Sequence, residues 1–231
     1  MESLNRYLDA AILKPEMTQA EVATAIKDCL NVNPATVCIR PCDIALAKEL
    51  CADSEVGVCV VLGFPHGDQL SASKADEAKR YVAAGVDEID MVANFGLVRS
   101  GAWDAVEADI AAVSAVTRPA GIPLKVIFES CHLSEAEVTR LTETCIKAGA
   151  DYVKTSTGFN GPGASDEAVT AMVRAANKQI KIKPSGGIRD AARARALIAM
   201  GVHRLGVGYS SAIDICRGTD EPAPPTNAHT Y

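Results

Sequence analysis

Two lysines stand at the ends of short β-rich segments that also carry glycines. Lys154 lies in DYVKTSTGF at 151–159, and Lys183 lies in IKIKPSGGIRD at 180–190. Taken alone, Lys154 is compatible with a solvated lysine at a strand end, because buried lysines are rare unless they are paired or functional. On neighbouring strands the two ammonium groups repel, and the repulsion is relieved when one loses its proton. The pair therefore favours Schiff-base chemistry on one of the two lysines.

A carboxylate and a second charged pair follow from strand alternation. In DEIDMVANFG at 87–96, Glu88 and Asp90 share one face of the expected strand. Asp90, opposite the lysines, is expected to relay protons to a substrate hydroxyl. In LKVIFES at 124–130, Lys125 and Glu129 share a face, and we expect them to pair with each other or with the other charged groups in a supporting role.

Glycine-rich turns after the last two expected strands indicate a phosphate site. SGGIR at 185–189 and GVGYSS at 206–211 are suited to binding a phosphate through backbone N–H groups and a helix N-terminus. Neither segment has the spacing of a dinucleotide fingerprint after a first strand.

Strand-like and helical patterns alternate along the whole chain. Capping boxes at Thr18 and Ser134 mark helix starts, and segments 83–92, 147–156 and 199–208 repeat a helix end, a glycine and a strand. The eight expected strands are Tyr7–Ile12, Thr36–Arg40, Gly57–Gly63, Glu88–Ala93, Leu124–Glu129, Tyr152–Ser156, Ile180–Pro184 and Arg204–Val207. They predict a single-domain (β/α)₈ TIM barrel over residues 1–217, with a short N-terminal helix and a flexible tail at 218–231. An open doubly wound sheet is the alternative fold.

Composition limits the class of protein. The 231 residues carry a net charge of -6 and include eight cysteines without a C-x-x-C motif. We expect no nucleic-acid or membrane partner and a reduced, cytoplasmic protein. The C-x₃-C spacing of Cys38 and Cys42, and the adjacent Cys131 and His132, have no second half with zinc-like spacing, so no metal is expected.

Together these motifs give the chain a resemblance that covers about Tyr7 to Ser211. It is similar to the deoxyribose-phosphate aldolases in YLDAAILKP, ATVCIRP, GFPHG, DEIDMVANFG, LKVIFES, ADYVKTSTGF and KPSGGIR. The resemblance implies that Lys154 forms the Schiff base, that Lys183 lowers its pKa and handles protons, and that Asp90 serves in proton transfer. It also implies phosphate binding by Gly158, Gly186 and Gly187, completed after the last strand by Gly208 with Ser210 or Ser211.

Three further residues are candidate auxiliary groups: Asp9, Cys38 and the C-terminal Tyr231, whose phenol is considered as a proton donor at the enamine carbon. The sequence departs from the family pattern where Ala10 and Ala11 follow Asp9, and the segment LGVGYSSAI looks longer than the family's corresponding loop.

The implied reaction is reversible cleavage of 2-deoxy-D-ribose 5-phosphate to D-glyceraldehyde 3-phosphate and acetaldehyde, without a cofactor. This makes the chain an expected carbon–carbon lyase of carbohydrate degradation, acting on small molecules, and compatible with a homodimer. Three alternatives stay open: a Schiff-base aldolase for another sugar phosphate, a binding protein that kept the fold, and a phosphate-binding isomerase barrel.

Overall fold

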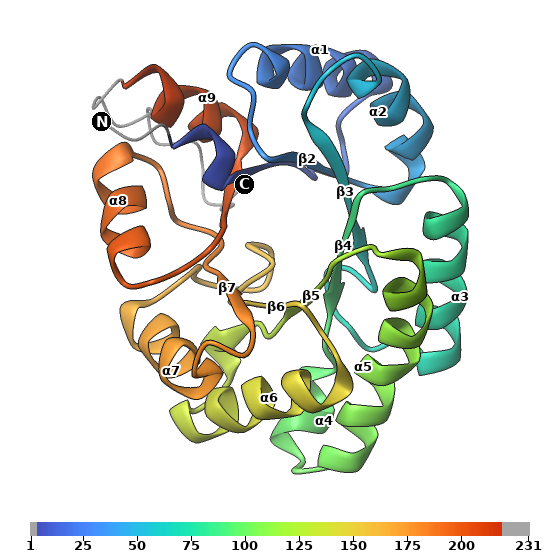
Figure 1. Cartoon of the computed structure of the whole chain (residues 1–231), viewed down its shortest axis with the longest axis vertical. Helices are drawn as coiled ribbons and strands as arrows, with labels where there is room; N and C mark the ends of the chain where they lie inside the picture. The colour runs from blue at the N-terminus through green and yellow to red at the C-terminus, as the bar shows by residue number, and fades with distance from the viewer. Residues whose placement is uncertain (1–3, 219–231) are drawn as a thin grey trace.

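A computed structural model describes residues 4–218 and contains eight parallel strands in one sheet, in the order β7-β6-β5-β4-β3-β2-β1-β8. Helices form a ring around this sheet (Figure 1). The strands are β1 Leu8–Ile12, β2 Thr36–Ile39, β3 Gly57–Leu62, β4 Glu88–Val92, β5 Leu124–Ile127, β6 Tyr152–Lys154, β7 Lys181–Lys183 and β8 Leu205–Gly208. All eight expected strands are confirmed, and the barrel rather than the open sheet is correct.

The pairing between β7 and β8, which closes the barrel, differs from the other strand pairings. Instead of a continuous ladder, it uses one parallel bridge between Ser185 and Gly206, with the Gly206 N–H donating to the Pro184 carbonyl at 2.8 Å. A Cβ on Gly206 would lie 2.3 Å from Ser185 Oγ. The barrel therefore closes because this position has no side chain.

Each strand is followed by helical structure that covers the outside of the barrel. The α-helices are α1 Gln19–Leu30, α2 Ile44–Cys51, α3 Ser71–Ala83, α4 Phe95–Arg99, α5 Trp103–Thr117, α6 Glu135–Ala148, α7 Asp166–Ala176, α8 Ala191–Ala199 and α9 Tyr209–Arg217. The short 3-10 helices are η1 Asn5–Tyr7, η2 Pro41–Asp43, η3 Arg118–Ala120 and η4 Ser130–His132. The expected short N-terminal helix corresponds to η1. Within residues 4–218, no helix combines the length and the apolar character that crossing a membrane requires.

Helix starts follow the local sequence closely. Both predicted capping boxes are formed, at Thr18 with Glu21 and at Ser134 with Glu137. Gly149 ends α6 in the left-handed conformation at φ 81°, which turns the chain into β6 as the repeat predicts. Residues 219–231 lie outside the described part of the chain, so the predicted tail and the role of Tyr231 stay predictions.

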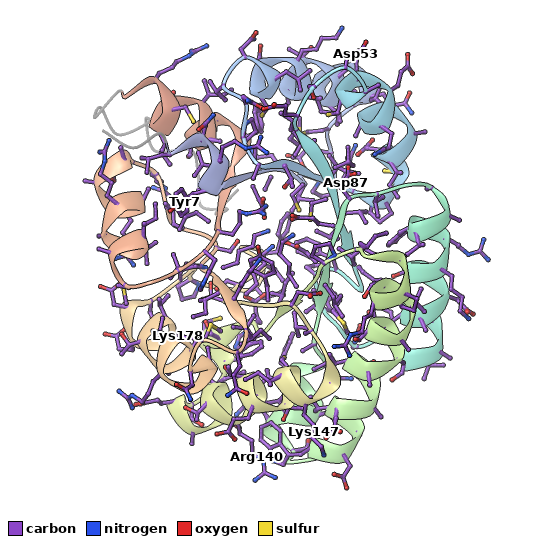
Figure 2. The ribbon with its side chains drawn as sticks, in the orientation of Figure 1. Tyr7, Asp53, Asp87, Arg140, Lys147 and Lys178 are labelled. Atoms are coloured by element: carbon purple, nitrogen blue, oxygen red, sulfur yellow. The ribbon has the colours of Figure 1, made fainter. Side chains whose placement is uncertain are left out.

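Side chains along each strand alternate between the core next to the helices and the interior of the barrel. Apolar side chains such as Val37, Ile89 and Val153 belong to the large core between the sheet and the helices. The side chains that alternate with them, among them Asp9, Asp90 and Lys154, point into the barrel and are almost completely buried. In Figure 2, Lys147 and Arg140 lie on the outer side of the ring, on α6. The barrel interior therefore holds most of the buried charges of the protein, whereas the core between sheet and helices is mainly apolar.

One ion pair is buried between the barrel and its helices. Lys74 of α3 places Nζ 2.6 Å from Asp109 Oδ2 on α5 and 3.1 Å from the Val92 carbonyl at the end of β4. Neither side chain is more than 3% exposed. Removing one partner of such a pair leaves an uncompensated buried charge, which is strongly destabilising.

We expect Asp109→Ala to lower the free energy of unfolding by about 3–5 kcal/mol, measured by urea denaturation, because Lys74 would keep a buried charge. The double variant Lys74→Met with Asp109→Leu should recover most of that loss. As a control, Lys79→Ala breaks a pair with Asp76 that is more than 60% exposed, and its effect should stay within about 0.5 kcal/mol. Equal losses in Asp109→Ala and Lys79→Ala would contradict the assignment.

Candidate active site

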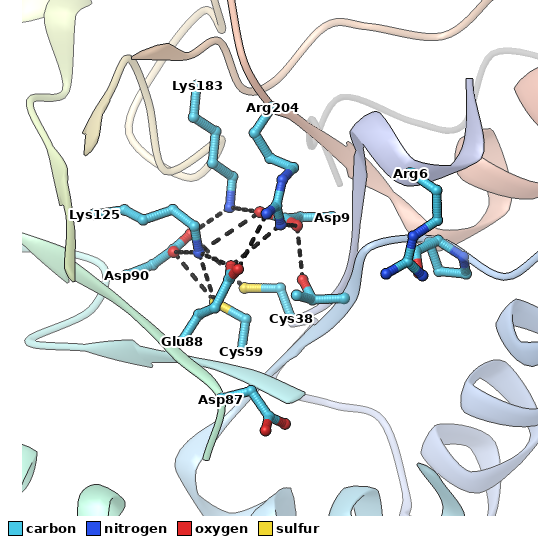
Figure 3. A network of polar contacts seen from close by, with 12 residues as sticks. Arg6, Asp9, Cys38, Cys59, Asp87, Glu88, Asp90, Lys125, Lys183 and Arg204 are labelled. Carbon is cyan, nitrogen blue, oxygen red and sulfur yellow. Dashed lines mark hydrogen bonds and ion pairs between the residues drawn. The ribbon is translucent and has the colours of Figure 1, made fainter. Parts of the chain in front are cut away.

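The carboxylate of Asp90, on β4, lies at the centre of the charged barrel interior. Its Oδ2 atom accepts hydrogen bonds from Lys154 Nζ at 2.8 Å and from Lys183 Nζ at 2.6 Å. Its Oδ1 atom accepts from Lys125 Nζ at 2.8 Å. Figure 3 shows Asp90 among the groups that converge from several strands. One buried carboxylate thus holds three ammonium groups.

The two candidate catalytic lysines are direct neighbours in the sheet. Lys154 ends β6 and Lys183 ends β7, and the two residues face each other in the parallel register of these strands. Both side chains are at most 3% exposed. The expected proximity of the two lysines and Asp90 is therefore confirmed as geometry.

A second layer of charges lies beside this centre, and Asp9 belongs to it. Asp9 Oδ2 is 2.5 Å from Lys183 Nζ, and Asp9 Oδ1 accepts from Arg204 Nη1 at 2.5 Å and from Thr36 Oγ1 at 2.8 Å. Lys125 Nζ is 2.5 Å from Glu88 Oε2, which also pairs with Arg204. Asp9 therefore positions Lys183 from the side opposite Asp90.

The charges in this network do not balance. Its cations are Lys125, Lys154, Lys183 and Arg204, and its carboxylates are Asp9, Glu88 and Asp90. When all seven groups are ionised, four positive charges therefore meet three negative ones. An excess positive charge in a buried site favours the loss of one lysine proton.

Burial and pairing shift the pKa values in opposite directions. Burial by itself would raise the pKa of Asp90, but the ammonium groups of Lys125, Lys154 and Lys183 hold it well below its usual range. Burial would lower the pKa of Lys183, but the carboxylates of Asp9 and Asp90 raise it above its usual value. Burial would also lower the pKa of Lys125, but Asp90 together with the neighbouring Cys59, Glu88 and Asp9 raises it. Lys183 and Lys125 are therefore the lysines that the network holds protonated.

Glu129 organises the loop after β6 instead of pairing with Lys125. It has a left-handed backbone at φ 53°, and its carboxylate accepts from the Thr157 N–H at 3.1 Å, from the Thr157 hydroxyl and from Asn160 Nδ2 at 2.9 Å. The same Asn160 amide donates to the Pro65 carbonyl at 2.9 Å. The sequence option of a Lys125–Glu129 pair is wrong, because the chain turns between these residues and sends Glu129 into the β6 loop.

The predicted glycine turns lie close to one another at the barrel mouth. A Cβ on Gly163 would lie 2.3 Å from the Gly186 carbonyl oxygen, so the loop after β6 packs directly on the turn after β7. Gly158 and Gly186 are both in the left-handed region, at φ 82°. Gly187 follows at φ 77° with open space around its Cα.

The end of β8 leads directly into a helix. Gly208 is the N-cap of α9, and it has no side chain to satisfy the free N–H groups of the first turn, where Ser210 and Ser211 lie. The helix begins immediately after the strand, so the segment that looked longer in the sequence contributes a helix N-terminus rather than an extended loop. These N–H groups are suited to binding an anion.

One wall of the mouth is apolar, and one buried hydroxyl is unsatisfied. Phe64 and Phe159 make an edge-to-face contact at 5.2 Å between ring centroids, and they pack on Leu13 and Val61. Ser156 is fully buried, and its Oγ atom has no hydrogen-bond partner among the described residues. This hydroxyl is therefore available to a bound molecule.

Three members of the network were not predicted as site residues: Glu88, Arg204 and Cys59. Glu88 lies two residues before Asp90 on β4, so both side chains point to the same face, and the sequence could have identified Glu88 from this alternation. Cys59 Sγ lies 3.2 Å from Asp90 Oδ1, and Cys38, a predicted auxiliary residue, places Sγ at 4.0 Å from Oδ2. Arg204 precedes β8 and reaches Asp9 on the neighbouring strand β1 and Glu88 on β4. No sequence spacing connects Arg204 with those two residues.

The fold and this centre together define a (β/α)₈-barrel enzyme with a buried lysine–aspartate site. The family model of the DeoC/LacD family aldolases matches residues 5–216. A deoxyribose-phosphate aldolase of Clostridium perfringens is 41% identical over 217 residues, covering 94% of this chain and 96% of the relative. The chain therefore belongs to the DeoC/LacD family of aldolases, and it is a lyase.

Solved structures agree with this assignment. A structure described as "QR15, an Aldolase" superposes with a TM-score of 0.88 at 35% identity, covering 94% of this chain and 96% of the other. A tetrameric deoxyribose phosphate aldolase from Aeropyrum pernix superposes with a TM-score of 0.85 at 26% identity, covering 93% and 89%.

The pKa directions predict how stability depends on pH. Asp90 has a pKa lowered from 3.8, so its contribution is present above about pH 4 and is lost as the pH falls toward the folded value. Lys183 has a pKa raised from 10.5, so its contribution is present below about pH 10 and is lost as the pH rises. The free energy of unfolding, measured by urea denaturation across this range, should be constant at intermediate pH and fall at both the acidic and the alkaline end.

In Lys183→Met, the free energy of unfolding should fall less steeply at alkaline pH than in the unmodified protein. The variant lacks one of the groups that, at alkaline pH, stay protonated only in the folded state. The exposed helix residue Lys79 provides the control, since Lys79→Met should keep the full alkaline fall. An equally steep alkaline fall in all three proteins would contradict this reading of the network.

Proposed function

We propose that this aldolase cleaves 2-deoxy-D-ribose 5-phosphate to D-glyceraldehyde 3-phosphate and acetaldehyde, reversibly, through a Schiff base on Lys154. The observation that carries the proposal is the shared contact at Asp90, whose Oδ2 atom accepts from both Lys154 and Lys183 in a buried centre. The Clostridium perfringens relative, matched over 94% of the chain, is named a deoxyribose-phosphate aldolase.

Lys154 is the nucleophile in this proposal, because the network holds the other two lysines, Lys183 and Lys125, protonated. Lys183 contacts Asp9 and Asp90, and Lys125 contacts both of these and Glu88. Lys154 shares the Asp90 Oδ2 atom with the ammonium group of Lys183. Repulsion between two such groups favours the loss of one proton, and the raised pKa values of Lys183 and Lys125 leave Lys154 as the neutral amine. The amine then attacks the C1 carbonyl of the open-chain sugar, and loss of water gives the iminium.

Asp90 and Lys183 move the protons of the next steps. Because its pKa is held low, Asp90 is a weak base by itself, and it works by passing protons among groups that share its Oδ2 atom. With a water molecule, Asp90 and Lys183 remove the proton from the C3 hydroxyl. The C2–C3 bond breaks, its electrons enter the iminium, and glyceraldehyde 3-phosphate leaves. The remaining enamine is protonated and hydrolysed to acetaldehyde.

The glycines and α9 bind the phosphate group of the substrate. Gly158, Gly186 and Gly187 offer backbone close to the mouth, and the free N–H groups of α9 beyond Gly208 add a positive helix end. No step needs a metal or an organic cofactor, because the iminium supplies the electron sink.

We further propose a cytoplasmic enzyme of deoxyribose phosphate catabolism that acts as a homodimer. The eight free cysteines suit a reducing compartment. The Aeropyrum pernix relative is described as a tetramer, so a mass measurement in solution decides between these assemblies.

Incubation with acetaldehyde and borohydride should give a stable adduct that maps to Lys154. Lys154→Leu should abolish this adduct and lower kcat by about a thousandfold or more, because the covalent route is lost. Lys147, whose side chain is 72% exposed on α6, is the matched control, and Lys147→Leu should keep both adduct and activity. An adduct on Lys183, or activity that survives Lys154→Leu, would overturn the proposal.

A negative charge at the start of α9 should weaken binding of the phosphorylated substrate. We expect Ser210→Asp or Ser211→Asp to raise KM for 2-deoxyribose 5-phosphate about tenfold or more, with little effect on unphosphorylated 2-deoxyribose. The residue with the larger effect is the one closer to the phosphate. Ser73→Asp, in the first turn of α3 and exposed, is the control. Equal effects on both sugars would count against a phosphate site here.

A further inference from the structure

Two cysteines that the proposed reaction does not use contact its central carboxylate. Cys38 of β2 and Cys59 of β3 face each other in the parallel register, and both are buried. Their Sγ atoms and an Asp90 oxygen all lie within 4.8 Å of one another. Cys59 Sγ is 3.2 Å from Asp90 Oδ1 and 3.4 Å from Lys125 Nζ. The pair is thus part of the charged interior.

The surroundings favour a thiolate over a bound cation. Two sulfurs and a carboxylate are suitable ligands for a soft metal, but three ammonium groups already occupy Asp90 and repel any added positive charge. The same ammonium groups stabilise an anionic sulfur. A hydrogen bond from Cys59 lowers the pKa of Cys38, whereas burial raises the pKa of Cys59. Cys38 is therefore the better nucleophile of the pair.

The pair also lies beneath the barrel mouth. Cys38 and Cys59 form a small cluster with Ala11, Leu13 and Val61, against which Phe64 and Phe159 pack. Leu13, Val61 and the two phenylalanines also line a cavity of about 280 Å³ that opens at this end of the barrel. Cys38 and Cys59 therefore lie directly behind the apolar wall of this cavity.

We propose that Cys38 and Cys59 are a redox-active pair, which a peroxide oxidises to a disulfide and thereby switches off the aldolase site. Neighbouring parallel strands lie about 4.8 Å apart, within the Cα separation that disulfides span. This proposal concerns regulation of the site described above, and it rests on the proposed function only for its activity readout.

The oxidation proceeds in two balanced steps. The Cys38 sulfur attacks one peroxide oxygen, the O–O bond breaks, and a sulfenic acid and one water form. The Cys59 sulfur then attacks the Cys38 sulfur, the S–O bond breaks, and a second water leaves with the proton from Cys59. Two electrons have passed from the two sulfurs to the peroxide, and an added dithiol reverses the change.

The disulfide removes a hydrogen bond from the central carboxylate. Its sulfurs turn toward each other and carry no proton, so Cys59 stops donating to Asp90 Oδ1. Asp90 then loses one of the contacts that fix its orientation toward Lys154 and Lys183. We expect kcat to fall by about tenfold or more, the effect of losing one hydrogen bond to a buried charge.

The test uses the full chain with its two exposed cysteines replaced, Cys42→Ser and Cys131→Ser. After treatment with hydrogen peroxide, the cleavage rate is measured and the peptides are mapped without reduction. The expected result is a peptide pair joined through Cys38 and Cys59, with loss of activity that dithiothreitol restores. In the same background, Cys59→Ala and Cys38→Ala should each keep their own starting activity through the treatment. Prior borohydride trapping of acetaldehyde on the enzyme should slow the linkage.

Absence of the joined peptides would overturn the proposal, as would equal inactivation of the parent and Cys59→Ala. Full activity in a sample whose Cys38 and Cys59 peptides are completely joined would also contradict the proposed inactivation. Failure of the proposed function gives a different pattern, because peptide mapping reports the linkage in an enzyme of any specificity. In that case the acetaldehyde adduct on Lys154 is missing from the reduced enzyme.

Discussion

The requirement that a buried charge be compensated governs this barrel. An isolated ammonium or carboxylate inside a protein costs several kcal/mol, so each interior charge of the network needs partners from other strands. Asp90 is a shared partner of Lys125, Lys154 and Lys183, and Asp9 and Glu88 add further compensation for Lys183 and Lys125. Replacing such a network with apolar residues is often neutral or stabilising, so its presence is better explained by chemistry than by stability.

The excess of positive charge connects stability to reactivity. A fully neutralised network would keep every lysine protonated, and a larger excess would destabilise the barrel. With Arg204 included, the network exceeds neutrality by a single charge. Asp9 contacts Lys183 in addition to Asp90, and both carboxylates raise its pKa, so in the proposed reaction Lys183 stays positively charged while Lys154 reacts. Under the proposed mechanism, a carboxylate that does not react with the substrate thereby distinguishes two similar lysines.

The barrel mouth shows how loops from distant segments are fixed by few contacts. Glu129 holds the loop after β6, and Asn160 ties that loop to the Pro65 carbonyl after β3. Gly163 and Gly186 allow the loops after β6 and β7 to touch. Because these contacts are made by backbone and buried polar groups, the turns proposed to bind phosphate are held by the same structure that holds the lysines.

The sequence by itself determined the parts that depend on local periodicity and chemistry. Alternation and glycine spacing gave the eight strands, and parity together with strand order placed Lys154, Lys183 and Asp90 in one interior. The tertiary structure decided the long-range pairings. Arg204 reaches Asp9 across 195 positions of the chain, and no local pattern encodes such a contact. Likewise, strand alternation predicts that Glu129 and Lys125 share one face. The strand ends before Glu129, whose left-handed backbone directs its side chain to the loop after β6, because alternation holds only while the strand continues.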